Sequence, residues 1–275
     1  MMMDHSFSFA RMPHDRPAGG SAQYLREVLA ARMLIRNFLI QDMKLKYRRS
    51  MLGFLWTLLN PVLMLLVLTL AFTFIFDRRY PLHLFATLLP WQFFASSLAE
   101  GGQSIIKSHT FLLNWNVPKL IFPLRHVLFR FCEYIFALIG LFSIAWLIGF
   151  RPTTALFILP LSIVLLFLVA LGLGTILSVF SIYFRDTHHL LDVVLRGWFY
   201  LTPVIIPFEH IPERIQPFFK LNPMYYLLEM FDAPITRGVW PASEVVTISC
   251  LMAIAACAGA LAVLSRFEDD VVFRL

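Results

Sequence analysis

The stretch TALFILPLSIVLLFLVALGLGTILSVFSI, residues 154–182, decides the fold of this protein, and it contains no charged side chain. A helix rises about 1.5 Å per residue, so about 20 apolar residues cross the hydrocarbon core of a bilayer, which is about 30 Å thick. The stretch exceeds that length. It therefore predicts a helix that spans a membrane.

Composition extends this interpretation to the whole chain. Of the 275 residues, 59% are hydrophobic and 15% are charged, whereas a soluble domain carries about 45–50% apolar and about 25% charged residues. Apolar runs of sufficient length predict an all-α integral membrane protein with six transmembrane helices, at about 51–76, 83–104, 124–149, 154–182, 188–206 and 243–264. We expect a flexible cytoplasmic tail at 1–20, a transmembrane domain at 21–265 and a second cytoplasmic tail at 266–275.

The net charge of +6 does not indicate a nucleic-acid partner, because nine of the 23 Lys and Arg residues precede Ser50, next to the first apolar run. Basic residues in that place are a topology signal. With the N-terminus inside, 15 of the 23 lie on the inner face and six on the outer face. The sequence therefore predicts that both termini are cytoplasmic.

Two segments outside the spans have distinctive patterns. In residues 21–46, apolar side chains such as Tyr24 and Val28 are interleaved with Arg32 and Arg36. This pattern favours an interfacial helix along the cytoplasmic leaflet, with a solvated helix as the alternative. Residues 207–242 are too polar and too rich in proline to span, yet too aromatic for a plain linker. They predict short re-entrant helices between spans five and six.

The sequence carries no ATP-binding motif. A phosphate-binding Walker A loop requires G-x-x-x-x-G-K-[ST], and the nearest approach, GGQSIIKS at 101–108, has Ile106 in place of the second glycine. The three cysteines are scattered in apolar stretches, which argues against a metal site. We therefore expect a protein that is not an enzyme, binds no cofactor or metal, and takes energy from a partner.

Charges inside predicted spans are few. Arg130 and Glu133 are separated by three residues, and Asp192 and Arg196 by four, so each pair can neutralise itself on one helix face. Glu100 lies near the inner end of span two. Both structural pairing and the lining of a polar path fit these residues.

Aromatic and basic residues supply candidate contacts for a substrate. Three aromatic residues near the middle of span five either face lipid or line a path for sugar rings: Trp198, Phe199 and Tyr200. The cluster Lys44, Lys46, Arg48 and Arg49 at the inner end of span one sets topology or attracts anionic head groups. The candidate residues for the substrate path or head group are Arg48, Arg49, Trp56, Trp198, Phe199 and Tyr200.

Several longer motifs, in one order along residues 24–265, resemble the permease subunits of type-2 ABC exporters for O-antigen and teichoic acid polysaccharides. They are YRRSMLGFLWTLLNPVLMLLVLTLAFTFIF (47–76), YPLHLFATLLPWQFFASSL (80–98), PKLIFPLRHV (118–127), YFRDTHHLLDVVLRGWFYLTPVIIPFEHIP (183–212) and LNPMYYLLEMF (221–231). The resemblance implies a permease homodimer in the cytoplasmic (inner) membrane with two copies of a separate ATPase, which holds ATP and Mg²⁺. Its cargo would be a lipid-linked polysaccharide of the O-antigen, capsule or teichoic acid type.

The resemblance also implies two sets of functional residues. The loops at 105–117 and 184–189 would contact the ATPase, through Lys107, Ser108, His109, Asn114, Asn116, Arg185 and Asp186. Residues 207–235 would form the external gate, with Phe208, Pro212, Phe218, Tyr225 and Tyr226. Asp192 and Arg196 stand where such permeases have mostly uncharged residues.

Two alternatives remain at this stage. A type-2 ABC exporter of a small drug or lipid has the same architecture, and the width and aromatic lining of the path distinguish the two. A membrane-embedded glycosyl- or acyltransferase needs acidic or His residues clustered at one membrane face, which the sequence does not show.

Overall fold

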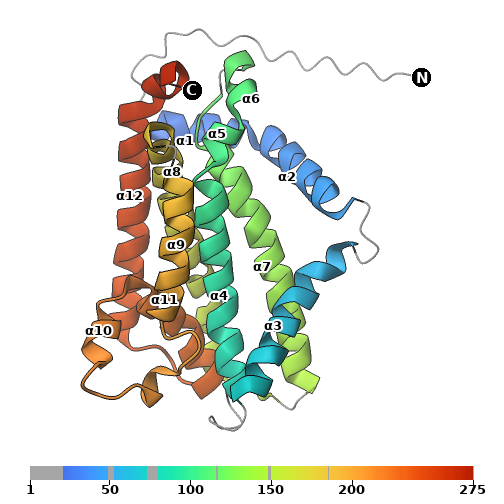
Figure 1. The fold of residues 1–275 in the computed structure, drawn as a ribbon, viewed down its shortest axis with the longest axis vertical. Coiled ribbons are helices and arrows are strands. Elements are labelled where there is room, and N and C mark those ends of the chain that lie inside the picture. Colours follow the sequence, from blue (N-terminus) through green and yellow to red (C-terminus); the bar gives the residue numbers. More distant parts are fainter. Residues whose placement is uncertain are drawn as a thin grey trace.

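A computed structural model shows the fold (Figure 1) and describes residues 21–48, 53–72, 80–115, 117–147, 150–184 and 186–274. Over these ranges every regular element is a helix, so the all-α prediction is confirmed. The predicted tail at 1–20 and the ends of the first predicted span, 51–76, lie outside the described residues.

Long helices build the body of the molecule. They run along its length in alternating directions (Figure 1). Their bounds are α3 (Trp56–Phe72), α4 (Tyr80–Gly101), α7 (Ile121–Leu147), α8 (Leu159–Tyr183), α9 (Thr187–Tyr200) and α12 (Ser243–Arg274). The 3-10 turn η1 (Gly53–Leu55) precedes α3, and η2 (Thr154–Ile158) precedes α8.

α8 lies at the centre of the packing, against α12, α4 and α7. Its contact with α12 depends on Gly172, where an added Cβ would lie 2.5 Å from the backbone carbon of Ala256. Small residues at such a crossing let two apolar helices approach closely. The close packing of α8 on α12 at this point therefore depends on the absence of a side chain.

Two of the described helical stretches are long and apolar enough to cross a membrane, Thr154–Tyr183 and Ser243–Phe267. They coincide with the predicted spans 154–182 and 243–264. α3 and α9 have 17 and 14 residues, fewer than the roughly 20 that a perpendicular crossing needs. The composition and these two helices mark the chain as a membrane protein.

One end of the bundle, here called the α1 end, holds the short helices α1 (Ser21–Ala30), α2 (Arg32–Tyr47), α5 (Ser104–Lys107) and α6 (His109–Asn114). The C-terminal end of α12 lies there too (Figure 1). The helix predicted over 21–46 is present as α1 and α2, which bury Val28 and Ile35 but expose 70% of Leu29. Apolar and basic side chains thus lie on the outside of this pair.

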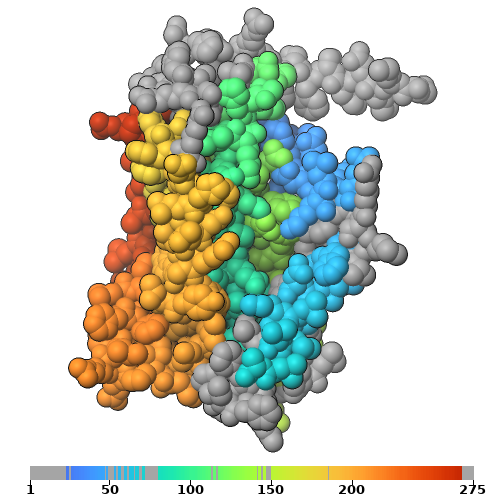
Figure 2. Space-filling model, viewed as in Figure 1, coloured from blue at the N-terminus to red at the C-terminus, as the bar shows by residue number. Residues whose placement is uncertain are grey.

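The opposite end, here called the α11 end, holds η3 (Phe208–His210), α10 (Gln216–Lys220), α11 (Pro223–Asp232) and the π-helical turn η4 (Ala233–Arg237). Figure 2 shows these elements as the broad base of the molecule. Asn222 caps α11 by accepting a hydrogen bond from the Met224 amide. The short helices predicted for 207–242 are therefore present, and α11 is largely buried.

Two boundaries differ from the prediction. α9 ends at Tyr200, and residues 201–206 form turns instead of continuing the span predicted at 188–206. Pro203 explains this end, because proline lacks the N–H that a further turn needs and restricts the residue before it. At the C-terminus α12 continues to Arg274, so the backbone of the predicted tail at 266–275 is helical as far as that residue.

Candidate functional site

α5 and α6 form a short helical hairpin at the α1 end. Its apolar residues Ile105 and Leu112 are buried, with 0% and 5% exposed. Lys107 and Asn114 are exposed, and the Asn114 amide donates to the Thr110 carbonyl at 2.8 Å. The hairpin is thus anchored by its apolar side and leaves polar side chains exposed.

α2 connects this hairpin with α7. The Arg125 Nε on α7 donates to Asp42 Oδ2 on α2 at 2.6 Å, and its second nitrogen donates to the other carboxylate oxygen. The same guanidinium lies 4.4 Å from the ring centroid of Phe38, which meets Phe111 of α6 edge-on at 5.3 Å. Bidentate pairing of this kind fixes orientation as well as distance.

A second ionic network lies further along α7. The predicted pair of Arg130 and Glu133 is confirmed at 2.7 Å. Glu133 also accepts from Lys46 at 2.5 Å, and the Arg130 Nε donates to Glu100 at 2.8 Å. The network therefore joins α2, α4 and α7.

The predicted pair of Asp192 with Arg196 is not the contact that the structure shows. Asp192 lies 3.8 Å from His188, one turn earlier on α9. Arg196 is exposed.

A pocket of about 420 Å³ opens beside this network, between α3 and the α4–α7 pair. The residues that line it are Lys46, Trp56, Asn60, Leu89, Trp91, Gln92, Phe93, Ala95, Ser96, Arg130, Glu133, Tyr134 and Ala137. Charged, amide and aromatic side chains thus share one cavity, which suits a ligand with both polar and apolar faces.

The aromatic residues of α9 have different environments. Trp198 packs edge-on against Trp91 and Phe94, and its Nε1 donates to the α11 cap, Asn222, at 2.8 Å. Phe199 also contacts Trp91, whereas Tyr200 is 74% exposed. Trp198 therefore connects α9, α4 and α11 within one chain, and Tyr200 is the accessible ring of the three.

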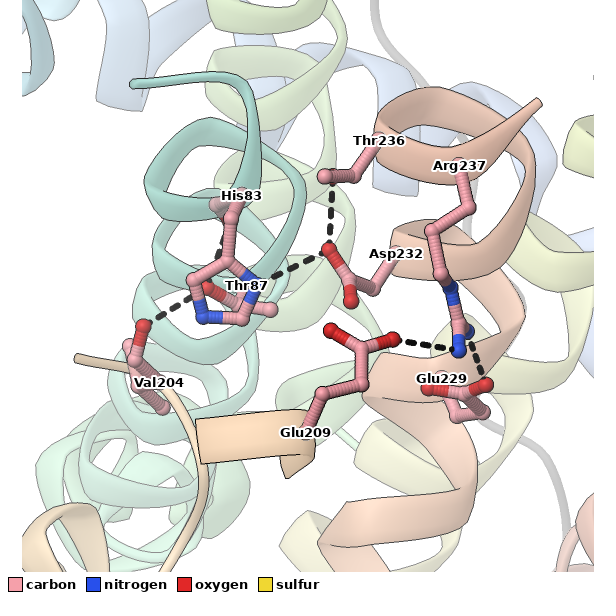
Figure 3. Close-up of polar contacts among 8 residues, drawn as sticks. All are labelled: His83, Thr87, Val204, Glu209, Glu229, Asp232, Thr236 and Arg237. Atoms are coloured by element: carbon pink, nitrogen blue, oxygen red, sulfur yellow. Dashed lines mark hydrogen bonds and ion pairs between the residues drawn. The ribbon is translucent and has the colours of Figure 1, made fainter. Parts of the chain in front are cut away.

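A buried polar contact attaches the α11 end to α4 (Figure 3). His83 Nδ1 donates to Asp232 Oδ1 at 2.9 Å, and the Thr236 hydroxyl donates to the same oxygen at 2.7 Å. His83 and Asp232 are 3% and 6% exposed. Burial by itself would raise the pKa of Asp232, but the hydrogen bonds and charge around it, His83 foremost, lower that pKa below its ordinary value.

Arg237 organises a second network at this end. It donates to Glu209 on η3 at 2.9 Å and also to Glu229 on α11 (Figure 3). Burial raises the pKa of Glu229, and the Arg237 charge offsets only part of that rise. One guanidinium thus ties η3 to the continuous helical segment of α11 and η4.

The gate residues expected from the sequence fall into two groups. Phe208 contacts Tyr225 with ring centroids 4.7 Å apart, and Tyr226 lies beside Tyr225 at 5.1 Å. Burial raises the pKa of Tyr225 to about 12, so its hydroxyl stays neutral. Pro212 and Phe218 are exposed and take no part in this cluster.

The sequence pattern of the ABC-2 type transporter matches residues 33–235, which include α2 to α11 and most of η4. The chain belongs to the ABC-2 type transporter family. It is 31% identical over 237 residues to the O-antigen export system permease protein RfbA of Myxococcus xanthus, a match that covers 84% of this chain and 89% of that protein. This confirms the resemblance seen in the sequence.

Two further relatives of this chain are also named as export or transport proteins. An O-antigen export system permease protein RfbA of Klebsiella pneumoniae is 26% identical over 203 residues, 72% of this chain and 78% of that protein. The polysialic acid transport protein KpsM of Escherichia coli is 24% identical over 214 residues, 75% of this chain and 83% of that protein.

The remaining predicted residues of this ABC-2 chain are distributed as follows. On the hairpin, Ser108 and His109 are half-buried; Asp186, the residue before α9, is exposed. Arg48 is exposed after α2, and Trp56 is 41% exposed on the pocket wall. Arg49, Asn116 and Arg185 lie outside the described residues.

Sequence reasoning missed several polar residues of this ABC-2 chain, among them His83, Asp232, Gln92 and Asn60. Each is a single polar residue in or beside an apolar run. A polar group at membrane depth needs a partner or a cavity. The place of these residues in apolar runs was therefore the one sign in the sequence that they have a role.

Proposed function

We propose that this chain is the transmembrane subunit of an ABC transporter that exports a lipid-linked polysaccharide of the O-antigen, capsule or teichoic acid type. The observation that carries the proposal is the match to permeases named for O-antigen export over most of both chains. These names favour polysaccharide over a small drug or lipid as cargo. They also favour transport over transferase chemistry.

The proposed topology has six spans with both termini in the cytoplasm. Two features support it. The helices that correspond to the predicted spans alternate in direction, and α1 and the C-terminal end of α12 lie at the same end of the bundle (Figure 1). The excess of Lys and Arg assigns that α1 end to the cytoplasm. The α11 end then faces outward, and its short helices form the external gate around Phe208 and Tyr225.

The proposed assembly is a homodimer with two copies of an ABC ATPase. One bundle is too thin to enclose a polymer path. α9 exposes 69% of Val193 and 65% of Leu190, and α3 exposes 65% of Leu70, so both helices have apolar faces that a second copy can cover. α3 and α9 flank α4 on the face seen in Figure 2, and we place the path there.

The ATPase would dock on the α5–α6 hairpin and the turn before α9. Exposed Lys107 and Asn114 and half-buried His109 offer polar contacts at this surface, and Arg185 would add a cation. ATP and Mg²⁺ belong to that partner, and this chain needs no cofactor. Lys44 and Arg48, both exposed, would attract anionic head groups.

Deletion of the gene tests the proposed function. Surface polysaccharide should be lost while its lipid-linked precursor accumulates on the inner leaflet, and the intact gene should restore export. If deletion instead changes the resistance of the cells to a toxic small molecule while surface glycan persists, the chain belongs with the drug or lipid exporters.

A further inference from the structure

The charges on the wall of the pocket between α3 and the α4–α7 pair cancel one another. Lys46 and Arg130 contact Glu133 at 2.5 and 2.7 Å, and Arg130 also contacts Glu100. A phosphate would meet cations that are already paired and carboxylates that repel it. An acyl chain would remove water from the same charges, which is unfavourable at membrane depth. The wall therefore disfavours both ligands.

Uncharged hydrogen-bonding groups complete the lining. The side-chain amides of Gln92 and Asn60 each donate and accept, and neither has a hydrogen-bond partner among the described residues. Tyr134 is 4% exposed, and its hydroxyl also lacks a partner within the described part of the chain. The two amides can pair with a ligand that offers both donors and acceptors, and among the described residues the buried Tyr134 hydroxyl is the one group of the three that is left without a partner out of contact with water.

Aromatic rings supply the apolar part of the same pocket. Trp56 on α3 is 41% exposed, whereas Trp91 on α4 is 5% exposed and packs against Trp198 and Phe199. An indole face packs against the C–H face of a sugar ring while the ring hydroxyls remain free for amides. The volume of about 420 Å³ falls in the range of about 300–1,000 Å³ that is usual for small-ligand sites.

We infer that this pocket binds one or two uncharged sugar units of the exported glycan. The inference rests on the proposed function. It locates a glycan contact inside one protomer, between α3, α4 and α7, and assigns recognition to Gln92, Asn60 and the Trp56 indole.

Photocrosslinking in intact cells tests the pocket. A benzophenone amino acid at Ala95, which lines the cavity, should yield a permease adduct that stains for periodate-oxidised sugar. The matched position is Ile254, 66% exposed on α12 and outside the pocket lining, which should give lipid adducts only. A phospholipid adduct without glycan at position 95 overturns the inference.

A second arm compares variants that all carry the same probe at position 95. Gln92→Leu with Asn60→Leu removes both amides at similar volume, and in the crosslinker background it should lower the glycan adduct about tenfold at equal protein level. Gln41→Leu, on the exposed side of α2, should leave the yield unchanged. An unchanged yield in the double variant contradicts the pocket. If gene deletion leaves surface glycan intact, the proposed function itself fails.

Discussion

The two ends of the bundle hold their short helices by different kinds of polar contact. At the α1 end, the pairs are partly exposed: the side chains of Arg125 and Asp42 are 19% and 17% exposed, and that of Lys46 is 40% exposed. At the α11 end, His83 and Asp232 are almost completely buried. Partly exposed pairs contribute little to stability, whereas breaking one partner of a buried pair costs several kcal/mol. Breaking the polar contacts at the α1 end therefore costs less free energy than detaching α11 from α4.

The largest expected effect follows loss of His83. His83→Leu leaves the Asp232 carboxylate buried, with the Thr236 hydroxyl as its one remaining hydrogen-bond donor among the described side chains, so the free energy of unfolding should fall by about 3–5 kcal/mol. Thermal unfolding of the purified protein measures this. Adding Asp232→Leu should restore part of the loss, because both polar groups are then gone. His189→Leu, an exposed histidine on α9, is the matched control, and equal destabilisation by both would contradict a special role for His83.

A smaller effect should follow acidification. The pKa of Asp232 is lower in the folded protein than its ordinary value of 3.8, so the unfolded chain takes up the proton first as the pH falls. Its stabilising contribution is therefore complete above about pH 4 and is lost as the pH falls through the lowered pKa. The melting temperature should drop below pH 4, and Asp232→Asn should flatten that drop. An identical slope in the variant would assign the acid sensitivity to other groups.

Substitution of Arg125 should have a moderate, local effect. Arg125→Ala removes the bidentate contact with Asp42 and the contact with Phe38, which together should contribute about 1–2 kcal/mol. We expect faster proteolysis within α2 at little change in melting temperature. Arg125→Lys, which keeps the charge but not the fork, should be intermediate. Cleavage that stays at the rate of the unmodified protein would show that the apolar contacts alone hold α2.

The smallest effect should come from Lys46. Its pair with Glu133 is the more exposed of these contacts, so Lys46→Met should cost less than about 1 kcal/mol. Salt screens exposed pairs. The shift in melting temperature caused by Lys46→Met should therefore be smaller in 0.5 M salt than in low salt. A loss as large as that of His83→Leu would remove the contrast between the two ends.

The sequence alone determined the class of this protein, the central span at 154–182 and the membership of the ABC-2 family. It also gave the helix over 21–46 and the short helices before the last span. These properties depend on composition, on the length of apolar runs and on local periodicity, all of which are read along the chain. Pro203 was a local signal too, and it explains why α9 ends before the predicted limit.

Only the tertiary structure decided which polar residues of different helices meet. His83 and Asp232 are 149 positions apart, and Arg130 and Glu100 are 30 apart. The sequence left Trp198 facing lipid or lining a path for sugar rings, whereas the structure packs it against Trp91 and the α11 cap of its own chain. Periodicity fixes the face of a helix on which a side chain lies, but the neighbour of that face depends on how whole helices pack.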